Sequence, residues 1–241
     1  MKTIIIIQAR MGSSRLPGKV LMPLGETVVL NYVVKRCRQV LGVAEVIVAT
    51  STLLQDNAIA DWCRQNGVTC FRGSEDDVLS RYYTCAVPYN PDYVIRVTSD
   101  CPFVDYEMAS DLVKMMDQEQ VDIIDVEGEI PRGLVVEIVS FAALERMYQV
   151  GIEPRHREHV TYYAYEHREQ FTRKTYKMNP TLCQPQLRIT LDTEEDYALC
   201  EKIGEHFRDD LFVASEKVVE FLLKNPDIAV INAHIEQKPV V

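Results

Sequence analysis

The pattern of hydrophobic and polar positions predicts alternating strands and helices in the first half of the chain. Short apolar runs at residues 4–7, 46–49, 70–71 and 93–97 are typical of buried strands. Between them, residues 29–41 and 58–63 carry apolar side chains at helical spacing, and Gly67 follows the second of these segments as a helix stop. Strands and helices that alternate in this way form βαβ units, so the pattern predicts a parallel sheet.

After about residue 120 the pattern is less regular. It predicts strands at residues 123–124, 134–139 and 187–191 and helices at 141–148, 193–207 and 214–224. Thr193 and the acids that follow it are typical of a helix start, and Asn225-Pro226 ends the last helix. We therefore expect one α/β domain over residues 1–241, with a core of about residues 1–120 and 185–225 and an inserted region of about residues 121–184.

Composition narrows the classes of protein that fit this pattern. The 241 residues are 47% hydrophobic, which is enough for a sizeable core, and a net charge of −10 argues against general nucleic-acid binding. Seven dispersed cysteines without a C-x-x-C pair indicate reduced thiols. No apolar run approaches the ~20 residues of a membrane span, so we expect a cytoplasmic protein without a membrane partner.

The loop after the first predicted strand combines glycines with cations. Residues 8–19 read Gln-Ala-Arg-Met-Gly-Ser-Ser-Arg-Leu-Pro-Gly-Lys. Gly12 and Gly18 allow backbone N–H groups to turn toward an anion, and Arg10, Arg15 and Lys19 supply positive charge. This combination favours a polyphosphate site. The alternative is that the glycines only form turns and the cations are solvated.

Spacing excludes two common nucleotide motifs for this loop. Five residues separate Gly12 from Gly18, and Val20 follows Lys19 where a Walker A motif has Ser or Thr. The glycines also fail the G-x-G-x-x-G spacing of dinucleotide-binding folds. The loop therefore fits neither a P-loop ATPase nor a dinucleotide-binding enzyme.

Two aspartates directly follow predicted strands. Asp100 comes after residues 93–97 and Asp192 after residues 187–191, so both could project from the carboxyl edge of a sheet, where carboxylates hold Mg²⁺ beside phosphates. On the residues alone, a turn role for each, or a helix-capping role for Asp192, stays open.

The loop and several later blocks resemble one enzyme family. Residues 9–24 resemble the opening signature of the cytidylyltransferases that activate acidic sugars, the acylneuraminate and 3-deoxy-manno-octulosonate enzymes, and match the spore-coat polysaccharide biosynthesis branch more closely. Further blocks follow in family order at residues 48–51, 71–79, 96–102, 157–161 and 191–196. The resemblance covers about residues 3–205.

The resemblance implies a fold and an activity. The fold would be a single-domain nucleotide-diphospho-sugar transferase (GT-A/Rossmann-like) fold with a mostly parallel sheet flanked by helices. The activity would be Mg²⁺-dependent transfer from a nucleoside triphosphate, CTP, to a sugar acceptor with release of pyrophosphate, serving surface polysaccharide or glycoconjugate biosynthesis. The relatives also imply a homodimer with its contact in the inserted region.

The resemblance assigns roles residue by residue. The catalytic residues it implies are Arg10, Arg15, Lys19 and Asp100. The nucleotide-binding residues are Ala9, Gly12, Ser13, Arg15, Lys19, Ala49, Thr50, Ser51 and Gly73. Metal binding falls to Asp100 and Asp192. The acceptor-binding residues are Arg96, Glu137, Arg157 and His159.

One position departs from the family pattern. Relatives commonly carry an aspartate where this chain has Val135, so the acceptor could differ here, although Glu137 is retained. A glycosyltransferase that uses a finished nucleotide sugar and a non-catalytic nucleotide-binding scaffold are the two alternatives to a cytidylyltransferase. Of these, the scaffold is motivated by Val135.

Overall fold

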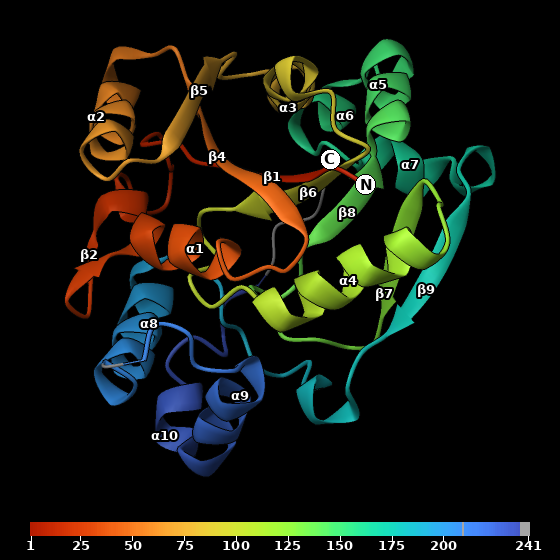
Figure 1. The fold of residues 1–241 in the computed structure, drawn as a ribbon. Helices are drawn as coiled ribbons and strands as arrows, with labels where there is room; N and C mark the ends of the chain where they lie inside the picture. The colour runs from red at the N-terminus through yellow and green to blue at the C-terminus, as the bar shows by residue number, and fades with distance from the viewer. Residues whose placement is uncertain (209, 237–241) are drawn as a thin grey trace.

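A seven-stranded sheet forms the centre of the protein. The computed structural model describes residues 1–208 and 210–236. The strands of the sheet are β1 (Thr3–Gln8), β4 (Val43–Ser51), β5 (Thr69–Gly73), β6 (Tyr93–Thr98), β7 (Ile123–Glu127), β8 (Glu137–Ser140) and β9 (Arg173–Lys177), in the spatial order β5-β4-β1-β6-β8-β7-β9. Neighbouring strands are parallel except at β8, which is antiparallel to both β6 and β7 (Figure 1). A short antiparallel pair, β2 (Pro23–Leu24) and β3 (Thr27–Val28), lies outside the sheet.

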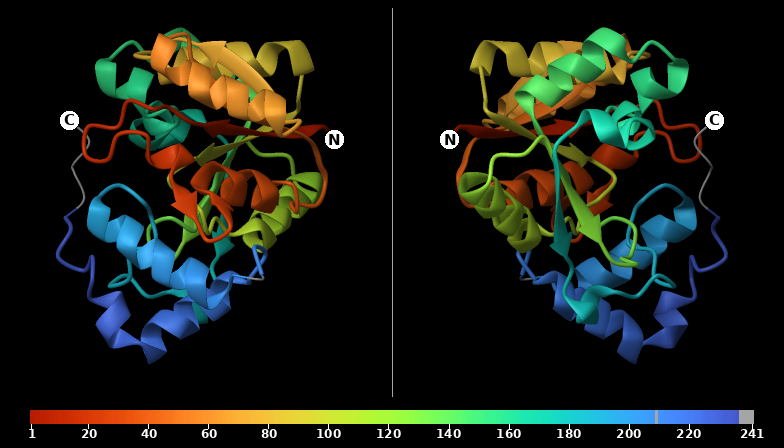
Figure 2. Two further views of the ribbon diagram at one scale, coloured as in Figure 1. Left: turned by 90° about the vertical axis from the view of Figure 1, so that its left-hand side faces the viewer. Right: turned by 90° about the vertical axis from the view of Figure 1, so that its right-hand side faces the viewer.

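Helices cover both faces of the sheet. They are α1 (Val29–Cys37), α2 (Asn57–Gln65), α3 (Val78–Ala86), α4 (Tyr106–Gln118), α5 (Phe141–Val150), α6 (Pro154–Glu158), α7 (Tyr162–Glu166), α8 (Glu194–His206), α9 (Ser215–Lys224) and α10 (Pro226–Ala229). Helices α1, α2, α4, α8 and α9 share one hydrophobic core, and α3, α5 and α7 share the other. Figures 1 and 2 show α8, α9 and α10 gathered below the sheet, beyond α1 and α4.

The run of four isoleucines in β1 is explained by its central position. Ile5 and Ile7 belong to one core and Ile4 and Ile6 to the other, and all four are fully buried. Successive side chains of a strand point to opposite faces, so a strand with helices on both faces needs apolar residues at every position. The same run therefore predicts both the strand and its central place.

Most of the predicted elements are confirmed, with two corrections. The strand predicted at residues 134–139 begins only at Glu137. The strand predicted at residues 187–191 is wrong: this segment makes one isolated bridge, Arg132↔Arg188, and is not part of the sheet. Its apolar side chains are buried, and its amides bond to loop carbonyls at residues 100 and 132, so burial produced a strand-like pattern without a strand partner.

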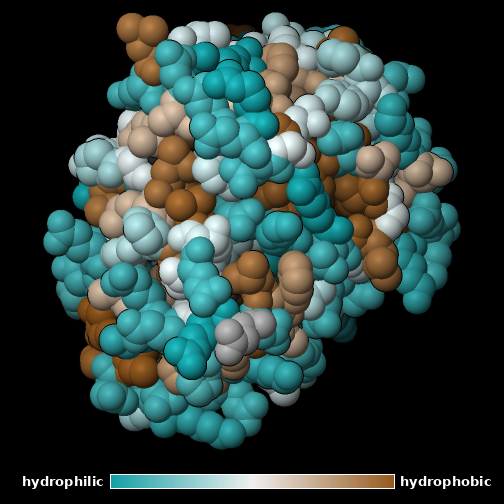
Figure 3. Space-filling view, turned by 60° about the vertical axis from the view of Figure 1, so that its left-hand side comes forward, coloured by the Kyte–Doolittle hydropathy of each residue, from teal (hydrophilic) through white to brown (hydrophobic). Residues whose placement is uncertain are grey.

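Residues 121–184 are continuous with the sheet, since β7, β8 and β9 all come from them. No helix within residues 1–208 and 210–236 is long and apolar enough to cross a membrane. On the face drawn in Figure 3, hydrophobic side chains lie in separate patches among hydrophilic ones. Such scattered exposure is ordinary for a globular protein.

Candidate active site

A cavity of about 500 Å³ opens at the carboxyl ends of β1 and β6. These strands are neighbours in the sheet, although the chain forms β4 and β5 between them. A parallel sheet has a crevice where the strand order changes direction in this way, and ligands of α/β proteins bind there. The loop after β1 and the segment after β6 supply most of the cavity wall, so the fold brings together two motifs that are far apart in the sequence.

The loop after β1 is held by its own backbone. The amides of Ser13 and Gly18 both donate to the carbonyl of Met11, at 2.9 and 3.0 Å, and Gly18 has a φ of +73° that favours glycine. The Gly18 amide is therefore used within the loop. The amides of Ser14 and Arg15 have no acceptor among the residues that the structure describes, and both residues line the cavity. These two groups are available to an anion.

Lys19 lies between the two aspartates that the sequence singled out. Its Nζ is 3.1 Å from Oδ2 of Asp100 and 2.8 Å from Oδ1 of Asp192, and it also donates to the carbonyl of Leu191 at 2.8 Å. Burial by itself lowers the pKa of an ammonium, but the charges of Asp100 and Asp192 outweigh this effect, so the pKa of Lys19 is raised. The two carboxylates thus already share one cation.

Asp192 is surrounded by positive charge. Its Oδ2 is 3.0 Å from a guanidinium nitrogen of Arg15 and 3.0 Å from Nη2 of Arg188. Burial alone would raise the pKa of this carboxyl, yet Lys19, Arg15 and Arg188 together hold it below its ordinary value. Asp192 is therefore ionised at neutral pH.

Among the described residues, five cations line this cavity: Arg10, Arg15, Lys19, Arg81 and Arg96. Arg10 lies near Glu75 at 3.6 Å and near Glu158 at 4.0 Å, and its side chain is 44% exposed. Such long ion pairs of an exposed side chain are weak, so Arg10 can turn toward a ligand. The charge of the cavity wall suits a polyanion.

The predicted nucleotide-binding residues divide into two groups. Ala9, Ser13, Arg15 and Lys19 line the cavity. The others lie outside its lining: Gly12 is exposed beside Gln55, Gly73 packs against Arg81, and the three residues at the end of β4 are fully buried, Ala49, Thr50 and Ser51. A contact between this second group and a base or ribose stays a prediction.

The predicted acceptor-binding residues also divide. Arg96 and His159 line the cavity, whereas Glu137 and Arg157 do not. The carboxylate of Glu137 pairs with Arg96 and accepts a hydrogen bond from Thr161 at 2.8 Å. Burial raises the pKa of a carboxyl, but Arg96 outweighs it, and the pKa of Glu137 is lowered. Glu137 therefore forms an ion pair with Arg96 from outside the cavity lining.

Arg157 points to another partner. Its guanidinium is 3.5 Å from Asp77 and lies over the ring of Tyr148. His159, by contrast, reaches the cavity, and burial followed by the charge of Arg96 lowers its pKa. A neutral imidazole at this place can accept or donate a hydrogen bond without adding charge.

A second cavity of about 610 Å³ adjoins the first. The two share Arg96, Thr98, Asp100 and Asp192, so the aspartates lie at the boundary between them. Val135 lines the second cavity and is 37% exposed. The remaining lining residues are apolar, polar and charged: Cys101, Glu129, Ile130, Pro131, Arg132, Gly133, Pro185 and Thr190.

Several lining residues were not predicted. They include Gln8, Ser14, Arg81, Thr98, Ser99 and Glu158. Arg81 is 1% exposed on α3, where its spacing looks like that of any helix residue, and no local signal marks it. Gln8 lies in the quoted loop, and its Oε1 is buried without a hydrogen-bond partner among the described residues, so it is a candidate ligand contact that the loop itself could have suggested.

The metal donors are few. Within residues 1–208 and 210–236, no group of three or more His, Cys, Asp or Glu side chains is arranged to hold a metal ion. Asp100 and Asp192 are a pair, which suits Mg²⁺ because this ion usually takes one or two carboxylates and completes its shell with phosphate oxygens and water.

The fold and the cavity define a nucleotidyltransferase. A family model described as cytidylyltransferase matches residues 4–226, so the chain belongs to the cytidylyltransferase family. It is 35% identical over 235 residues to the spore coat polysaccharide biosynthesis protein SpsF of Bacillus subtilis, covering 94% of this chain and 96% of that protein. The predicted family resemblance is thereby confirmed.

Solved structures agree on the fold. A cytidylyltransferase from Leptospira borgpetersenii superposes with a TM-score of 0.90 at 30% identity, covering 99% of this chain and all of that one. The CMP:2-keto-3-deoxy-manno-octonic acid synthetase complexed with CTP has a TM-score of 0.65 at 19% identity, with 87% of this chain and all of that one covered. The single-domain fold with a mostly parallel sheet is confirmed.

Proposed function

We propose that the protein is a magnesium-dependent cytidylyltransferase that transfers CMP from CTP to a sugar. A hydroxyl of the sugar attacks the α-phosphorus, the bond to the β-phosphate oxygen breaks, pyrophosphate leaves, and the hydroxyl proton passes to solvent. The observation that carries the proposal is a five-cation cavity joined to a second cavity at Asp100 and Asp192, all within the described residues. The structural neighbour solved with CTP supports the choice of nucleotide.

The triphosphate would lie along the loop after β1. Arg10, Arg15 and Lys19 provide three full charges, and the open amides of Ser14 and Arg15 provide hydrogen bonds to phosphate oxygens. Charge develops on the leaving pyrophosphate as the bond breaks, and donors already in place stabilise it without reorganisation. A diphosphate sugar would leave part of this set of donors unused.

The pair Asp100 and Asp192 fits Mg²⁺. Both carboxylates lie within 3.1 Å of one ammonium, so the structure already holds a cation between them, and both face the cavity. A bound magnesium ion supplies charge stabilisation at the α-phosphate and the leaving group. Lys19 must turn from the aspartates to a phosphate when the site is filled, and its flexible stem allows this movement.

The second cavity is the proposed acceptor site. It adjoins the aspartates and has room for a sugar, and Arg132 supplies a cation to its wall. Val135, with Ile130 and Pro185, gives the same wall an apolar side. An acceptor with an apolar substituent would fit this wall better than an acceptor that has to be bound by a protein carboxylate at position 135. The SpsF relative supports a role in polysaccharide biosynthesis.

The test is a coupled assay with chemical identification of the product. The protein is incubated with CTP, Mg²⁺ and a panel of acidic, neutral and deoxy sugars; pyrophosphate is followed enzymatically and the CMP-sugar by mass spectrometry. We expect both products with at least one acceptor, in equal amounts, and neither product after chelation of the metal. Folded protein that releases no pyrophosphate with any nucleotide or sugar would contradict the proposal.

A binding titration separates the alternative activity. CTP should bind more tightly than CDP- and CMP-sugars because only the triphosphate uses all the donors of the loop. Tighter binding of a nucleotide sugar would favour a glycosyltransferase instead. Binding of none of these nucleotides would favour the non-catalytic scaffold.

We also propose a homodimer. Exposed apolar side chains occur in the region where the contact was expected: Val150 is 42% exposed, Ile152 78% and Tyr165 44%. Exposed apolar side chains in the expected contact region support this proposal, because large apolar patches often mark interfaces. Analytical ultracentrifugation at micromolar concentration should show a dimer that Ile152→Glu converts to a monomer, and a monomeric wild-type protein would refute this arrangement.

A further inference from the structure

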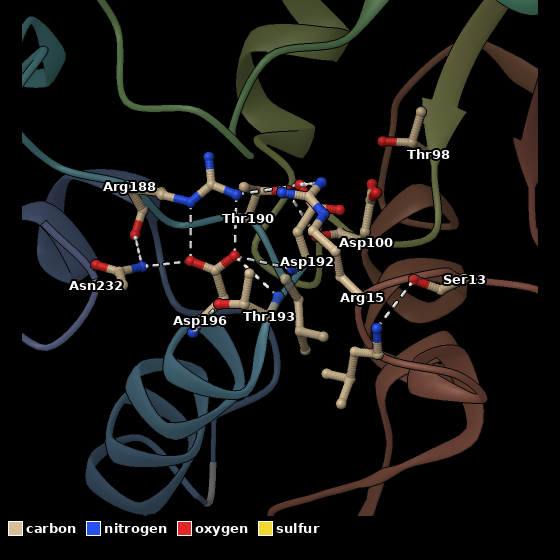
Figure 4. A network of polar contacts seen from close by, with 12 residues as sticks. Ser13, Arg15, Thr98, Asp100, Arg188, Thr190, Asp192, Thr193, Asp196 and Asn232 are labelled. Carbon is tan, nitrogen blue, oxygen red and sulfur yellow. Dashed lines mark hydrogen bonds and ion pairs between the residues drawn. The ribbon is translucent and has the colours of Figure 1, made fainter. Parts of the chain in front are cut away.

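A buried polar network lies directly behind Asp192. It consists of Arg188, Asp196 and Asn232, and we refer to it as the Asp196 network. The three side chains come from the segment before α8, from α8 and from the chain after α10, and they converge on the side of Asp192 that faces away from Ser13 (Figure 4). Arg188 is 7% exposed, Asn232 1% and Asp196 is fully buried.

Asp196 is the centre of the network because both of its carboxylate oxygens accept more than one hydrogen bond. Oδ1 accepts from Nε of Arg188 and from Nδ2 of Asn232, both at 2.8 Å. Oδ2 accepts from Nη2 of Arg188 at 2.9 Å and from the backbone amides of Asp192 and Thr193 at 2.9 and 3.2 Å. A buried carboxylate is tolerated when it is paired and hydrogen-bonded in this way, and loss of one partner is costly.

The network holds Asp192 at two points. The backbone amide of Asp192 bonds to Asp196, and Nη2 of Arg188 bonds to Oδ2 of Asp192 at 3.0 Å while it also bonds to Asp196. Oδ1 of Asp192 is left to face Lys19 at 2.8 Å. One guanidinium therefore sets the direction of the carboxylate that lines both cavities.

Asn232 links the Asp196 network to the segment that follows α10. Its Nδ2 donates to Asp196 and to the backbone carbonyl of Arg188, at 2.8 and 3.0 Å, so both hydrogens of its amide are used. The match to the cytidylyltransferase family ends at residue 226, before Asn232. Asn232 therefore lies beyond the residues that the family model matches.

We propose that Arg188, Asp196 and Asn232 are positioning residues that aim the carboxylate of Asp192 at a divalent cation in the active site. The proposal rests on the proposed function, because it concerns the cation that Asp192 would bind there. Partners behind a metal-binding carboxylate fix its orientation, and their removal typically weakens metal binding about 10- to 100-fold. The segment after α10 is thereby part of the active site.

A purely structural role is the competing explanation. Asp196 also helps to begin α8, since its amide bonds to Thr193 Oγ1 at 3.2 Å in a reciprocal capping arrangement. A cap alone would affect the melting temperature and leave cation binding in the folded protein unchanged. The experiment must therefore measure cation binding, and must ask whether the effect passes through Asp192.

Two variants probe the network from different sides. Arg188→Lys keeps the charge but cannot form the forked contact with both aspartates. Asn232→Ala removes the amide and keeps the pair of Arg188 and Asp196. Asn225→Ala is the matched control, because Asn225 lies in the same region and donates to the carbonyl of Phe221 in α9 instead. Thermal unfolding of each variant establishes that it is folded at the assay temperature.

The measurement is Mn²⁺ binding in the presence of CTP, followed by electron paramagnetic resonance. We expect binding about 10-fold weaker in Arg188→Lys and in Asn232→Ala, and unchanged in Asn225→Ala. In an Asp192→Asn background the same two substitutions should have less than about a twofold effect, because the group that they position is gone.

The outcomes separate the two proposals. If the wild-type protein does not bind Mn²⁺ with CTP, the proposed function fails. If the wild type binds and both network variants bind as tightly, the positioning proposal fails while the proposed function stands. It also fails if the substitutions weaken binding equally with and without Asp192. Should Arg188→Lys not fold, Asn232→Ala decides alone.

Discussion

Replacing Lys19 by methionine should change the binding of two ligands in opposite directions. Methionine keeps most of the length of the side chain and removes the ammonium that lies between Asp100 and Asp192. A divalent cation added alone should then bind more tightly, because no ammonium has to be displaced. CTP added without metal should bind more weakly, because a positive charge of the cavity is lost.

The magnitude follows from the contacts of the ammonium. It makes charge-assisted hydrogen bonds to two carboxylates, at 3.1 and 2.8 Å, and its side chain is only 10% exposed. Such bonds contribute about 1.5–3 kcal/mol in favourable sites. Partial solvation of Asp100 lowers this figure, so displacement of Lys19 costs about 2 kcal/mol, which corresponds to about 30-fold in affinity.

The assay is isothermal titration of Mn²⁺ alone and, separately, of CTP in the presence of a chelator. We expect Lys19→Met to bind Mn²⁺ about 30-fold more tightly than the wild type and to bind CTP more weakly. Lys224→Met is the matched control, since Lys224 pairs with Glu220 on the surface of α9. Weaker or unchanged Mn²⁺ binding in Lys19→Met would refute the idea that Lys19 and a cation share one place.

Three further predictions concern turnover, backbone strain and acid stability. Asp100→Asn should lower turnover about 100-fold with little change in melting temperature, as measured by product formation and calorimetry. Gly133→Ala should lower the free energy of unfolding by about 1–3 kcal/mol in urea, because Gly133 has a φ of +101° and a Cβ there would lie 2.5 Å from the carbonyl oxygen of Ile189. Asp125→Asn should cost about 1–2 kcal/mol at pH 7 and progressively less as the pH falls below about 4, because the hydrogen bond from Arg173 lowers the pKa of Asp125 in the folded state.

Each of these predictions has a clear contrary result. Normal turnover in Asp100→Asn would remove this residue from the site. A Gly133→Ala protein as stable as the wild type would show that the loop before β8 can relax. The stabilisation by Asp125 is present above its unfolded pKa and lost as the pH falls through the folded pKa, so a stability difference that is constant from pH 7 to pH 2 would contradict the pairing with Arg173.

Asp100 and Asp192 show how much of the candidate site could be predicted from the sequence. Asp100 follows a true strand, β6, and its place beside the loop after β1 follows from the order of the βαβ units. Asp192 reaches the same cavity although the strand expected before it is absent from the described sheet. Its position depends on Arg188, Asp196 and Asn232, whose contacts join distant parts of the chain and leave no local pattern.

The sequence by itself determined the central strands, the helices between them, the cationic loop and the family, because period, turn residues and motif spacing are local properties. The tertiary structure decided that Lys19 pairs with both aspartates, that Arg81 joins the cavity, and that residues 49–51 are buried outside its lining. These contacts join residues that are far apart in the sequence. They depend on packing and charge in the whole folded chain, so no single segment predicts them.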